Sequence, residues 1–513
     1  MKIAVGYPPM KLRYSGVPLL SQNRQYQIFH APTFIYPMVP AYAASNLKAH
    51  GYEVVWMDGI AEKLTYEQYL SQLEKERPDV LLVETKAPVL HHHWETITDL
   101  KSKFPEMLLV WVGDHLTWDP TETFDKSPVD FILTGGDYDF LILNLIDHLT
   151  KGTALEGGIW FRDGNSRIKN QETLELKTSP AGNKLRVTGP ISLKHNLDDL
   201  PFVDRDLTKW ELYAYANGNY KYFPGTYMYS GRDCWWGRCT FCVWDHTINP
   251  LGTYRSFSPK RLLDEIGYVL DHYPVKEIFD DAGTLRIGPW LKEFCTGLIE
   301  RGYNKRVVYG CNMRLNAIRD QETYDLMGKA NFRFILYGME SGNQKTLDKL
   351  DKGLQVEQIE EGVRMAKKAG LDPHLTVMMG YPWETFEDAK RTIDLAAHLF
   401  KKGYVDTLQA TVVIPYPGAP LWKECREKGW LLTEDYAHYD MREPVMKSEL
   451  TKERIMTLTQ ELYKSFLSPQ YIVRKVLEIR SFDDIKFLVL AGVKLVGHLL
   501  DFNKDQVKST KTL

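Results

Sequence analysis

The chain has 513 residues, more than one hydrophobic core usually supports, and this length indicates two or three domains. Lys and Arg number 64 against 67 Asp and Glu, a net charge of −3, which excludes the basic excess typical of nucleic-acid-binding proteins. With 44% hydrophobic residues, 26% charged residues and six cysteines, the composition indicates a globular protein and excludes both disorder and a disulfide scaffold.

The two ends of the sequence indicate where in the cell the protein is expected. The apolar run at the amino terminus is too short for a secretory signal peptide. The longest apolar run, residues 485–500, is interrupted by Lys486, Lys494 and His498 and is too short and too charged to span a membrane. Two interpretations of it are open: a helix buried against the rest of the protein, which we favour, or a helix at a membrane surface. We therefore expect a cytoplasmic protein, peripheral at the membrane under the second interpretation.

Residues 1–150 alternate short apolar runs with helical patterns. The runs at residues 3–5, 54–57, 80–83, 108–112 and 131–133 predict buried parallel strands. Helical patterns at 42–50 and 66–76 lie between them. This alternation predicts a doubly wound, Rossmann-like α/β domain that binds ligands at the carboxyl ends of its strands.

Residues 151–223 do not continue the β-α alternation. Strand-like residues 159–162 and 167–168 flank Asp163 and Gly164, which predicts a β-hairpin around an Asp-Gly turn. The proline and acidic residues of 197–201 indicate a linker. We expect this region to join two domains.

The β-α alternation resumes over residues 224–430. Strands are predicted at 226–229, 277–279, 306–309, 333–337, 375–379 and 407–413, separated by helical patterns such as 259–272 and 356–369. Six such units fit a partial or complete β/α barrel, whose active site lies where the strands end. Residues 431–513 form a helical carboxyl-terminal region by pattern.

Cys234, Cys239 and Cys242 lie within nine residues, directly after the first barrel strand. Three thiolates fit three corners of a 4Fe–4S cluster and leave one iron without a protein ligand. A zinc site with His246 as the fourth ligand is the alternative, because structural zinc takes four ligands. The remaining cysteines are isolated, and we interpret them as small buried hydrophobic residues. They are Cys295, Cys311 and Cys425.

A cluster with an open iron at the mouth of a β/α barrel resembles the radical S-adenosylmethionine (SAM) superfamily. The usual spacing there is Cys-x3-Cys-x2-Cys; the first gap here is four residues, while the aromatic Phe241 between the last two cysteines matches. The resemblance implies that SAM chelates the open iron and that the reduced cluster cleaves it to a 5′-deoxyadenosyl radical.

Segments after later strands resemble SAM-contacting segments of this superfamily. Residues 338–342 resemble its Gly-x-Glu-Ser segment, and residues 380–385 resemble its Gly-x-Pro-x-Glu-Thr segment. Two polar residues, Asp280 and Arg314, follow the second and third barrel strands. The SAM-binding residues that the resemblance implies are therefore Phe241, Asp280, Arg314, Glu340, Ser341 and Gly380. Plainer roles are open: Asp280 and the Glu384-Thr385 pair can cap local structure, and Arg314 can pair with an acidic neighbour.

The first domain, residues 197–201 and the barrel together resemble the cobalamin-binding class of this superfamily, which includes methyltransferases and the anaerobic magnesium-protoporphyrin monomethyl ester cyclases. The implied cobalamin-binding residues are Thr85, Lys86, Gly113, His115, Gly135 and Gly136. The Asp-x-His-x-x-Gly signature of histidine-ligated cobalamin is absent, so we expect base-off binding with His115 in a hydrogen-bonding or structural role. A degenerate domain without cobalamin is the alternative.

Three adjacent histidines, His91, His92 and His93, do not indicate a metal site. Neighbours on a helix diverge by about 100 degrees, so three in a row cannot converge on one ion. We expect a helix entry on a solvated face, with a chelate by two of them as the alternative.

The sequence thus predicts a cobalamin-dependent radical SAM enzyme that methylates an unactivated carbon of a small-molecule or lipid-like substrate. The implied cofactors are a 4Fe–4S cluster, SAM and cobalamin, and the implied partner is an electron donor such as flavodoxin or ferredoxin. One alternative is an oxidative cyclase or other radical rearrangement, since residues 462–472 are similar to tails of the cyclase branch. The other is a cobalamin or iron–sulfur sensor without turnover. The SAM-contacting segment at residues 338–342 argues against it, because a sensor does not need a SAM site.

Overall fold

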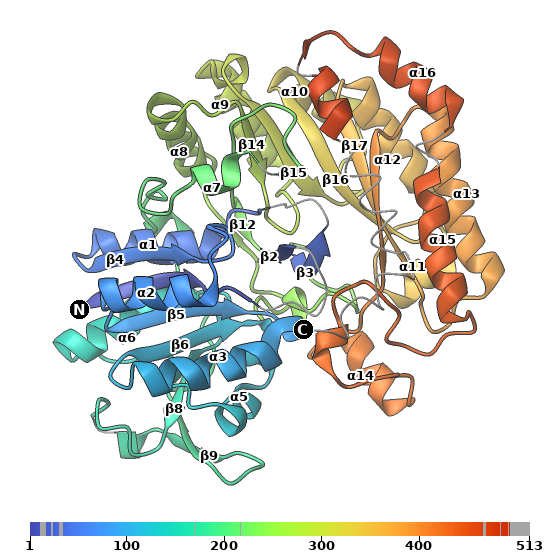
Figure 1. Ribbon diagram of the computed structural model, residues 1–513. Helices are drawn as coiled ribbons and strands as arrows, with labels where there is room; N and C mark the ends of the chain where they lie inside the picture. Colours follow the sequence, from blue (N-terminus) through green and yellow to red (C-terminus); the bar gives the residue numbers. More distant parts are fainter. Residues whose placement is uncertain are drawn as a thin grey trace.

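The computed structural model describes residues 1–10, 17–21, 24–29, 34–169, 171–215, 217–464, 468–482, 484–490 and 492. It contains two α/β bodies built on separate sheets. In Figure 1 the first body is blue to cyan, the second runs from green to orange, and the carboxyl-terminal helices are red.

The first body is an eight-stranded sheet in the order β4-β1-β5-β6-β7-β8-β10-β9. Its parallel part consists of β1 (Lys2–Tyr7), β4 (Glu53–Asp58), β5 (Val80–Thr85), β6 (Leu108–Gly113) and β7 (Phe131–Leu133). All five strands predicted for residues 1–150 are therefore present. The strand order reverses between β1 and β5, and in such sheets ligands bind at the carboxyl ends of the strands beside this point.

Alternate residues of the central strands pack against opposite helical layers. Ile3 and Val5 of β1 share a core with α1 (Met38–Ala49) and α6 (Tyr138–Lys151). Ala4 shares a second core with α2 (Tyr66–Glu76) and α3 (Leu90–Lys103) on the other face. Because side chains alternate along a strand, both faces are apolar, as a doubly wound sheet requires.

The predicted hairpin around Asp163 and Gly164 is wrong. Strand β8 (Ile159–Arg162) pairs antiparallel with β7 and with β10 (Lys184–Val187), and β9 (Glu175–Thr178) pairs with β10. The hairpin is thus β9–β10, and all three strands extend the first sheet. The buried side chains of Leu185 and Val187 alternate along β10, and this gives β8 a better partner than the polar residues after Gly164 do.

The second body is a six-stranded parallel sheet in chain order, a partial β/α barrel as predicted. Its strands are β11 (Gly225–Met228), β14 (Glu277–Asp280), β15 (Val308–Met313), β16 (Phe332–Glu340), β17 (Asp372–Met379) and β18 (Thr407–Val412). The helices between them are α8 (Pro259–His272), α9 (Pro289–Glu300), α10 (Gln321–Lys329), α11 (Gln344–Lys349), α12 (Val356–Lys368) and α13 (Phe386–Lys402). Local signals fix their starts: Ser258 caps α8 by accepting a hydrogen bond from the Arg261 N–H, and Pro259 is its first residue.

The open edge of the barrel sheet is covered by α15 (Lys452–Lys464). The Tyr463 hydroxyl donates to the Ala410 carbonyl at 3.1 Å and accepts from the Ala410 N–H at 3.0 Å. These bonds occupy backbone groups of β18 that another strand would otherwise pair with.

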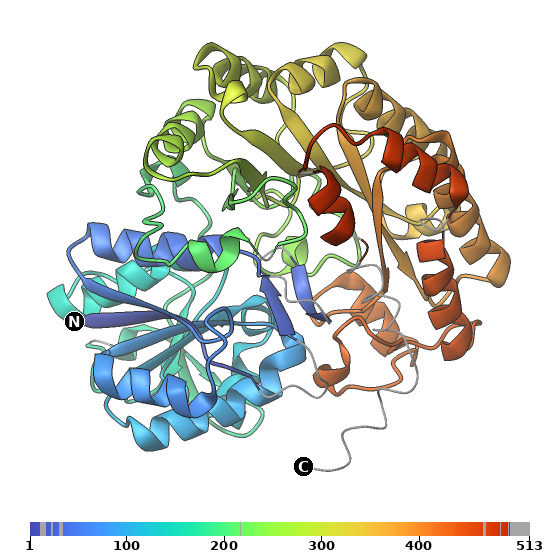
Figure 2. The same ribbon diagram turned by 45° about the horizontal axis from the view of Figure 1, so that its top comes forward.

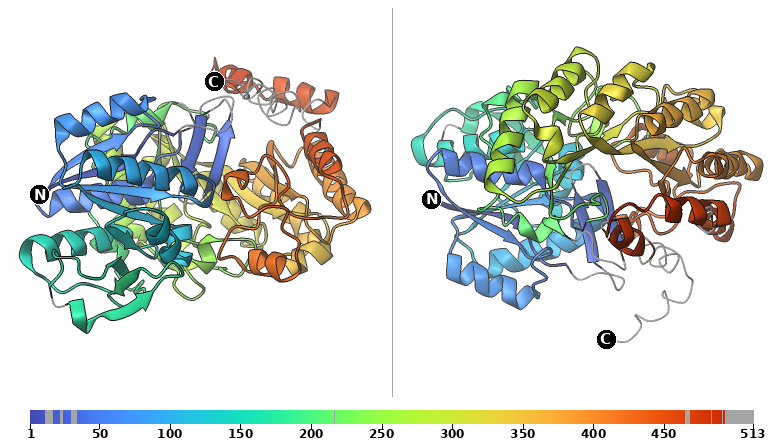
Figure 3. Two further views of the ribbon diagram at one scale, coloured as in Figure 1. Left: turned by 60° about the horizontal axis from the view of Figure 1, so that its bottom comes forward. Right: turned by 90° about the horizontal axis from the view of Figure 1, so that it is seen from above.

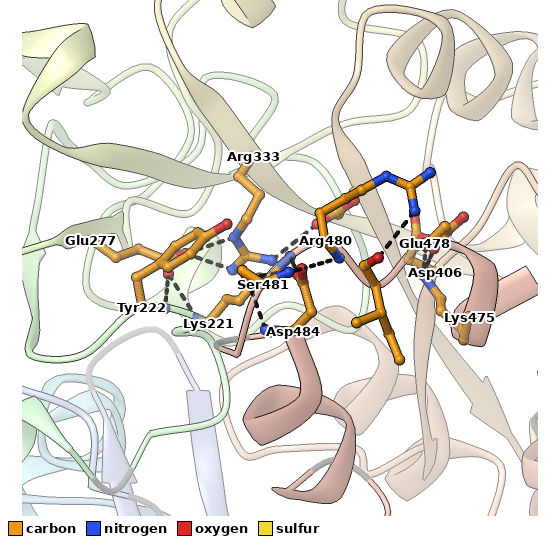
Figure 4. A network of polar contacts seen from close by, with 12 residues as sticks. Lys221, Tyr222, Glu277, Arg333, Asp406, Lys475, Glu478, Arg480, Ser481 and Asp484 are labelled. Carbon is orange, nitrogen blue, oxygen red and sulfur yellow. Dashed lines mark hydrogen bonds and ion pairs between the residues drawn. The ribbon is translucent and has the colours of Figure 1, made fainter.

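The following segment, α16 (Pro469–Leu477) and helical residues 484–490, is tied to the amino-terminal ends of the barrel strands. Lys475 pairs with Asp406, just before β18, and Asp484 pairs with Lys221. Figure 4 shows these ion pairs beside the buried pair of Arg333 with Glu277. The network holds the segment at the end of the barrel opposite the carboxyl ends of its strands.

The described part of the 485–500 run is packed on one side only. Phe487 and Leu488 are half-buried, and the Arg333 guanidinium lies 5.9 Å from the centre of the Phe487 ring. Ile485, Val489 and Leu490 are exposed, and the preceding Phe482 is 79% exposed. The helix over 485–490 thus packs against the barrel but is not buried all round, while 493–500 lie outside the described residues. Among the described residues, the helices are each too short or too polar to cross a membrane.

The two bodies contact one another through the carboxyl-terminal side of the first sheet. The Gly136 N–H, after β7, donates to the Ile248 carbonyl at 2.9 Å, and Arg232, after β11, donates to the Gly136 carbonyl at 2.6 Å. Figures 2 and 3 show the first body lying against the barrel in every view. The strand ends that face a ligand in each fold class thus lie along one interface.

Candidate functional site

The three clustered cysteines lie in a loop framed by a short ribbon. Strand β12 (Gly231–Arg232) precedes the loop, β13 (Arg255–Ser256) follows it, and the two strands pair antiparallel. Inside the loop the Cys242 N–H donates to the Cys239 carbonyl at 3.0 Å. Thr240 connects it to the barrel, because its N–H donates to the Leu350 carbonyl at 3.0 Å and its carbonyl accepts from the Leu421 N–H at 2.9 Å.

All three cysteines are free thiols, Cys239 buried and Cys234 and Cys242 half-buried. Burial raises the pKa of Cys234 to about 12 and raises the pKa values of Cys239 and Cys242. The charges of Lys352 and Arg314 act in the opposite direction on Cys239. A thiolate ligand in this loop therefore requires a strongly bound cation, which an iron–sulfur cluster supplies.

The alternative of a zinc site depends on His246 as its fourth ligand. The described residues contain no group of three or more His, Cys, Asp or Glu side chains placed to hold a single metal ion. His246 contacts the Cys239 carbonyl through Nε2 at 3.2 Å instead of approaching a thiol. A four-iron cluster spaces its three cysteine ligands more widely than one ion does, so the donor set fits the cluster better.

A buried ion pair lies beside the cluster loop. Glu340, with a left-handed φ of 64°, ends β16, and its carboxylate accepts from Lys352 Nζ at 2.8 Å. Arg314, after β15, donates to the Lys352 carbonyl and lies 4.3 Å from the centre of the Trp236 ring. The Lys352 ammonium is 5.9 Å from the ring centre of Phe241. Residues from four separate segments thus place two cations and one carboxylate at the carboxyl ends of the strands.

Lys352 was missed by the sequence reasoning. It follows α11 in a polar stretch with other lysines, and nothing local distinguishes it from a solvated residue. The structure shows it only 7% exposed. Nearby, Arg314 Nε, Asn312 Oδ1 and Thr284 Oγ1 are buried and have no hydrogen-bond partner among the described residues. Buried polar groups are normally hydrogen-bonded, so these atoms fit a polar ligand such as SAM at this mouth.

Ser341 and Glu384 form a second polar group. The Ser341 hydroxyl donates to Glu384 Oε1 at 3.1 Å, as does the Thr346 hydroxyl at 2.8 Å. Burial raises the pKa of Glu384 to about 7. Thr385 caps α13 in a capping box with Asp388. These residues connect the two family-like segments to each other.

Asp280 and Gly380 also have structural partners. Asp280 accepts hydrogen bonds from the Ser230 and Ala282 N–H groups, at 3.0 and 3.1 Å, and burial raises its pKa. Gly380 has a φ of 96°, and a side chain there would meet Ile455 of α15. Their roles toward SAM remain predictions.

Around the end of β5, the predicted cobalamin residues are buried and paired. The Thr85 hydroxyl contacts His93 Nδ1 at 2.7 Å. Lys86 donates to Glu84 at 2.9 Å, and its ammonium lies 3.7 Å from the centre of the Trp244 ring, two residues after Cys242. Lys86 therefore links the first body directly to the cluster loop.

His115 follows β6 at the start of α4 (Asp114–Trp118) and is fully buried. Its Nε2 contacts Glu122 of α5 (Pro120–Lys126) at 2.8 Å, while within the described part of the chain its Nδ1 has no hydrogen-bond partner. Glu122 lines a cleft of about 550 Å³ that also contains Trp118, Trp422 and Tyr436. The pairing of Nε2 fits the predicted hydrogen-bonding role.

The three predicted glycines have close backbone or side-chain neighbours. Gly113 has a φ of 144°, and a side chain there would overlap the Thr85 carbonyl. Side chains at Gly135 and Gly136 would overlap Ile191 and Asn249. The space beside the last two is filled by the linker and by the cluster-bearing body, so these glycines let other chain segments approach.

The three histidines begin a helix as predicted, since α3 starts at Leu90. The expected solvated face is wrong for His93, which is fully buried against Thr85. His91 points away and pairs with Asp435 at 3.4 Å. The triplet therefore does not converge on one point.

Comparison with known proteins agrees with this geometry. Residues 228–396, which contain the cysteine loop and most of the barrel, match the model of the Radical SAM superfamily. The resemblance is confirmed: residues 228–396 form a radical SAM domain, and the protein is an enzyme.

Within that class, the chain is similar to named proteins over most of its length. It is 26% identical to an uncharacterised methyltransferase from Pyrococcus horikoshii, covering 87% of this chain and 91% of the relative. It is 24% identical to the anaerobic magnesium-protoporphyrin IX monomethyl ester cyclase of Cereibacter sphaeroides, covering 84% and 66%. It is also 24% identical to the cytidylyl-2-hydroxyethylphosphonate methyltransferase of Streptomyces wedmorensis, covering 84% and 85%.

Two solved structures share the fold of both bodies. The cobalamin-dependent SAM radical enzyme OxsB, with aqua-cobalamin and SAM bound, aligns with a TM-score of 0.66 at 14% identity, covering 98% of this chain and 73% of that chain. The radical SAM methyltransferase TsrM from Kitasatospora setae, with cobalamin and a 4Fe–4S cluster bound, aligns with a TM-score of 0.60 at 16% identity, covering 87% and 84%. The predicted fold class is confirmed.

Proposed function

We propose that this enzyme methylates an unactivated carbon of a small molecule, with SAM and a 4Fe–4S cluster in the barrel and cobalamin held by the first body. The observation that carries the proposal is the interface: the residues after β5 and β7 lie against the segments that flank Cys234, Cys239 and Cys242. When bound, the cluster and SAM supply a carbon-centred radical, and cobalamin supplies a methyl group. Two solved structures that share the fold over 98% and 87% of this chain have cobalamin bound, which supports the proposal.

The barrel residues fit SAM by charge. A SAM molecule presents an ammonium and a carboxylate in its methionine part, and the site presents Glu340 together with Lys352 and Arg314. Charge-assisted hydrogen bonds between such groups are about twice as strong as neutral ones. We infer that the two cations hold the carboxylate, that Glu340 holds the ammonium or the ribose hydroxyls, and that Asp280, Ser341 and Gly380 shape the pocket.

In the first body, we propose that Thr85, Lys86, Gly113, His115, Gly135 and Gly136 border the cobalamin site. His115 is held by Glu122 through Nε2, which favours a hydrogen-bonding role over ligation of cobalt. Electron paramagnetic resonance of the Co(II) form tests this, because a coordinating nitrogen splits the signal. A spectrum without nitrogen splitting is expected. Splitting that disappears in His115→Ala would overturn the base-off proposal.

Methyl transfer is tested by anaerobic incubation of the cluster- and cobalamin-loaded enzyme with cell extract and SAM labelled in its methyl group. A labelled carbon in a new product, with 5′-deoxyadenosine and S-adenosylhomocysteine, is expected by mass spectrometry. 5′-Deoxyadenosine with an unlabelled product would contradict methylation.

Oxidative cyclisation is the second candidate. The similarity to the cyclase of Cereibacter sphaeroides over 84% of this chain favours it. In the same incubation, a cyclase yields 5′-deoxyadenosine and a product two hydrogens lighter than its substrate. A sensor without turnover yields neither, and the buried SAM-compatible charges beside Cys239 count against it.

We also propose that the carboxyl-terminal segment contacts an anionic membrane surface. Of the exposed large apolar residues, Ile472, Val473, Val476, Leu477, Phe482, Ile485, Val489 and Leu490 lie in this one segment. The exposed Arg480 and Lys486 lie among them, and residues 493–513 add four lysines against two aspartates. Apolar side chains with interspersed cations are typical of surface-bound helices.

A flotation assay with liposomes containing phosphatidylserine tests the membrane contact. We expect the protein to float, and the double variant Leu477→Asp/Val489→Asp to stay at the bottom. The matched control is Leu251→Asp/Leu432→Asp, which alters two exposed leucines elsewhere and should float. Absence of flotation in the unaltered protein, or dimerisation through the segment detected by light scattering, would refute the proposal.

A further inference from the structure

The linker between the two bodies crosses their interface as a strap. We define the strap as residues 190–196, which follow β10 and form neither helix nor strand. It lies on the end of β7, because a Cβ at Gly135 would be 2.5 Å from the Ile191 side chain. Directly after the strap, the Ser258 N–H at the start of α8 donates to Asp198 at 2.8 Å. The strap thus runs from the first body to the barrel body.

Backbone contacts contribute little to the position of the strap. Within the part of the chain that the structure describes, residues 191–195 form no backbone–backbone hydrogen bond. The Arg255 guanidinium donates to the His195 carbonyl at 3.1 Å. A segment with so few paired backbone groups opens easily unless its side chains anchor it.

The side chain of His195 supplies such an anchor. Its Nδ1 lies 2.8 Å from Asp137 Oδ2, and its Nε2 lies 2.9 Å from Glu156 Oε2. The ring also stacks on Phe140, with ring centres 4.2 Å apart and planes within 7°. An ionised carboxylate only accepts hydrogen bonds, and a neutral imidazole has a single N–H. Both contacts are therefore hydrogen bonds only when the His195 ring is protonated.

The surrounding charges favour the protonated ring. Three carboxylates and three cations meet here and balance when the imidazole is charged: Asp137, Asp139 and Glu156 with Arg232, Arg255 and His195. Burial lowers the pKa of His195, but the hydrogen bond and charge of Asp137 and the charge of Glu156 outweigh burial, so the pKa is raised above its usual value of 6.5. Lys194, the other charged residue of the strap, is exposed.

We propose that His195 is a pH-operated latch, whose imidazolium holds the strap across the interface and whose deprotonation releases it. A neutral ring can donate to one carboxylate only, and its second nitrogen then presents a lone pair to the other acceptor. Arg255 still pairs with Asp137, so the bodies stay connected while the strap loosens. Because the folded pKa is raised, the latch is fully closed below about pH 6.5 and opens as the pH rises through the folded pKa. The latch does not depend on which reaction the enzyme catalyses.

Cleavage of the full chain by a lysine-specific endoprotease tests the latch, because Lys194 is exposed and directly precedes His195. The cleavage rate at Lys194 is divided by the rate in a free peptide of residues 190–199, which removes the pH dependence of the protease. Between pH 6 and pH 9 we expect this ratio to rise about threefold or more, a factor reduced for the partial exposure of Glu156. His195→Gln should give the high ratio at every pH, and His195→Arg, which stays charged, should give the low one.

A control variant and a direct titration complete the test. His398→Gln removes a histidine that pairs with Glu360 at 3.0 Å on the barrel body, and it should leave the pH profile unchanged. Nitrogen-15 magnetic resonance of the histidine-labelled chain identifies the His195 signal by its loss in His195→Gln, and its midpoint should lie above pH 6.5. A midpoint at or below 6.5, or a cleavage ratio that does not change with pH in the unaltered chain, would refute the latch. A ratio that rises equally in His195→Arg would assign the opening to another group and refute it as well.

Discussion

A buried network of ion pairs connects the two bodies. We call it the ionic clamp: Arg232 and Arg255 of the barrel body with Asp137 and Asp139 of the first body. The variant Arg232→Met tests its contribution. Arg232, two residues before Cys234, is 1% exposed. Its guanidinium donates to both carboxylate oxygens of Asp139, at 2.6 and 3.1 Å, and lies 3.4 Å from Asp137. Arg255, its neighbour across the β12–β13 ribbon, donates twice to Asp137 at 2.7 Å.

Arg232→Met leaves the Asp139 carboxylate buried without its partner. Removing one member of a buried pair costs about 3–5 kcal/mol. At about 1.4 kcal/mol per factor of ten, the contact should open about 10² to 4 × 10³ times more often. Burial already raises the pKa of Asp139, and loss of the arginine raises it further. An acid whose folded pKa is raised destabilises the fold at pH values above that pKa, so lowering the pH should restore part of the loss.

Hydrogen exchange by mass spectrometry measures this locally, because unfolding of a multidomain chain is not two-state. Exchange in peptides covering 134–140 and 228–233 should accelerate in Arg232→Met. Arg333→Met, which breaks the buried pair with Glu277 at the other end of the barrel, is the matched control and should leave these peptides unchanged. The double variant Arg232→Met/Asp139→Leu should recover most of the loss. Unchanged exchange in Arg232→Met would refute the clamp.

Three further outcomes follow from the site. Replacing the three clustered cysteines by alanine should remove iron and the brown chromophore, whereas replacing the three isolated ones should leave both, as iron analysis would show. Lys352→Met should weaken SAM binding by about tenfold or more in calorimetry, since a charged hydrogen bond contributes about 1.5–3 kcal/mol, while Lys349→Met should not. Because the pKa of Glu384 is raised to about 7, its burial costs stability increasingly as the pH rises from about 4.5 and fully above 7. Amide protection around 341–346, corrected for the intrinsic rise of exchange with pH, should thus fall as the pH rises, and Glu384→Gln should remove that fall; equal protection profiles would contradict it.

Much of the fold was predictable because its signals are local. Continuous apolar runs and helix caps predicted the positions of the parallel strands in both bodies, since a buried parallel strand can be recognised from its own sequence. The cysteine loop was predictable for the same reason, because its three thiols are close in sequence. The segments that contain Glu340 and Gly380 were found by resemblance and lie at the ends of β16 and β17.

The features that the sequence did not predict depend on contacts between residues far apart in the chain. Lys352 is a site residue only because a turn after α11 brings it to Glu340, and no periodicity encodes that approach. The position of β8 was set by Leu185 and Val187, more than twenty residues away, which outweighed a favourable Asp-Gly turn. His93 is buried because the first turn of α3 lies over Thr85, a contact that a helical pattern alone does not reveal.

Both flanks of the cysteine loop are held by the first body, and this bears on how the enzyme matures. Arg232 precedes Cys234 and joins Asp139, and Trp244 follows Cys242 and lies under the Lys86 ammonium. A ligand that orders the loop between these two anchors therefore favours docking of the first body, and by linkage docking favours retention of that ligand. We expect maturation to be cooperative in consequence: loss of a cluster from the loop should loosen the first body, and reassembly of either part should assist the other.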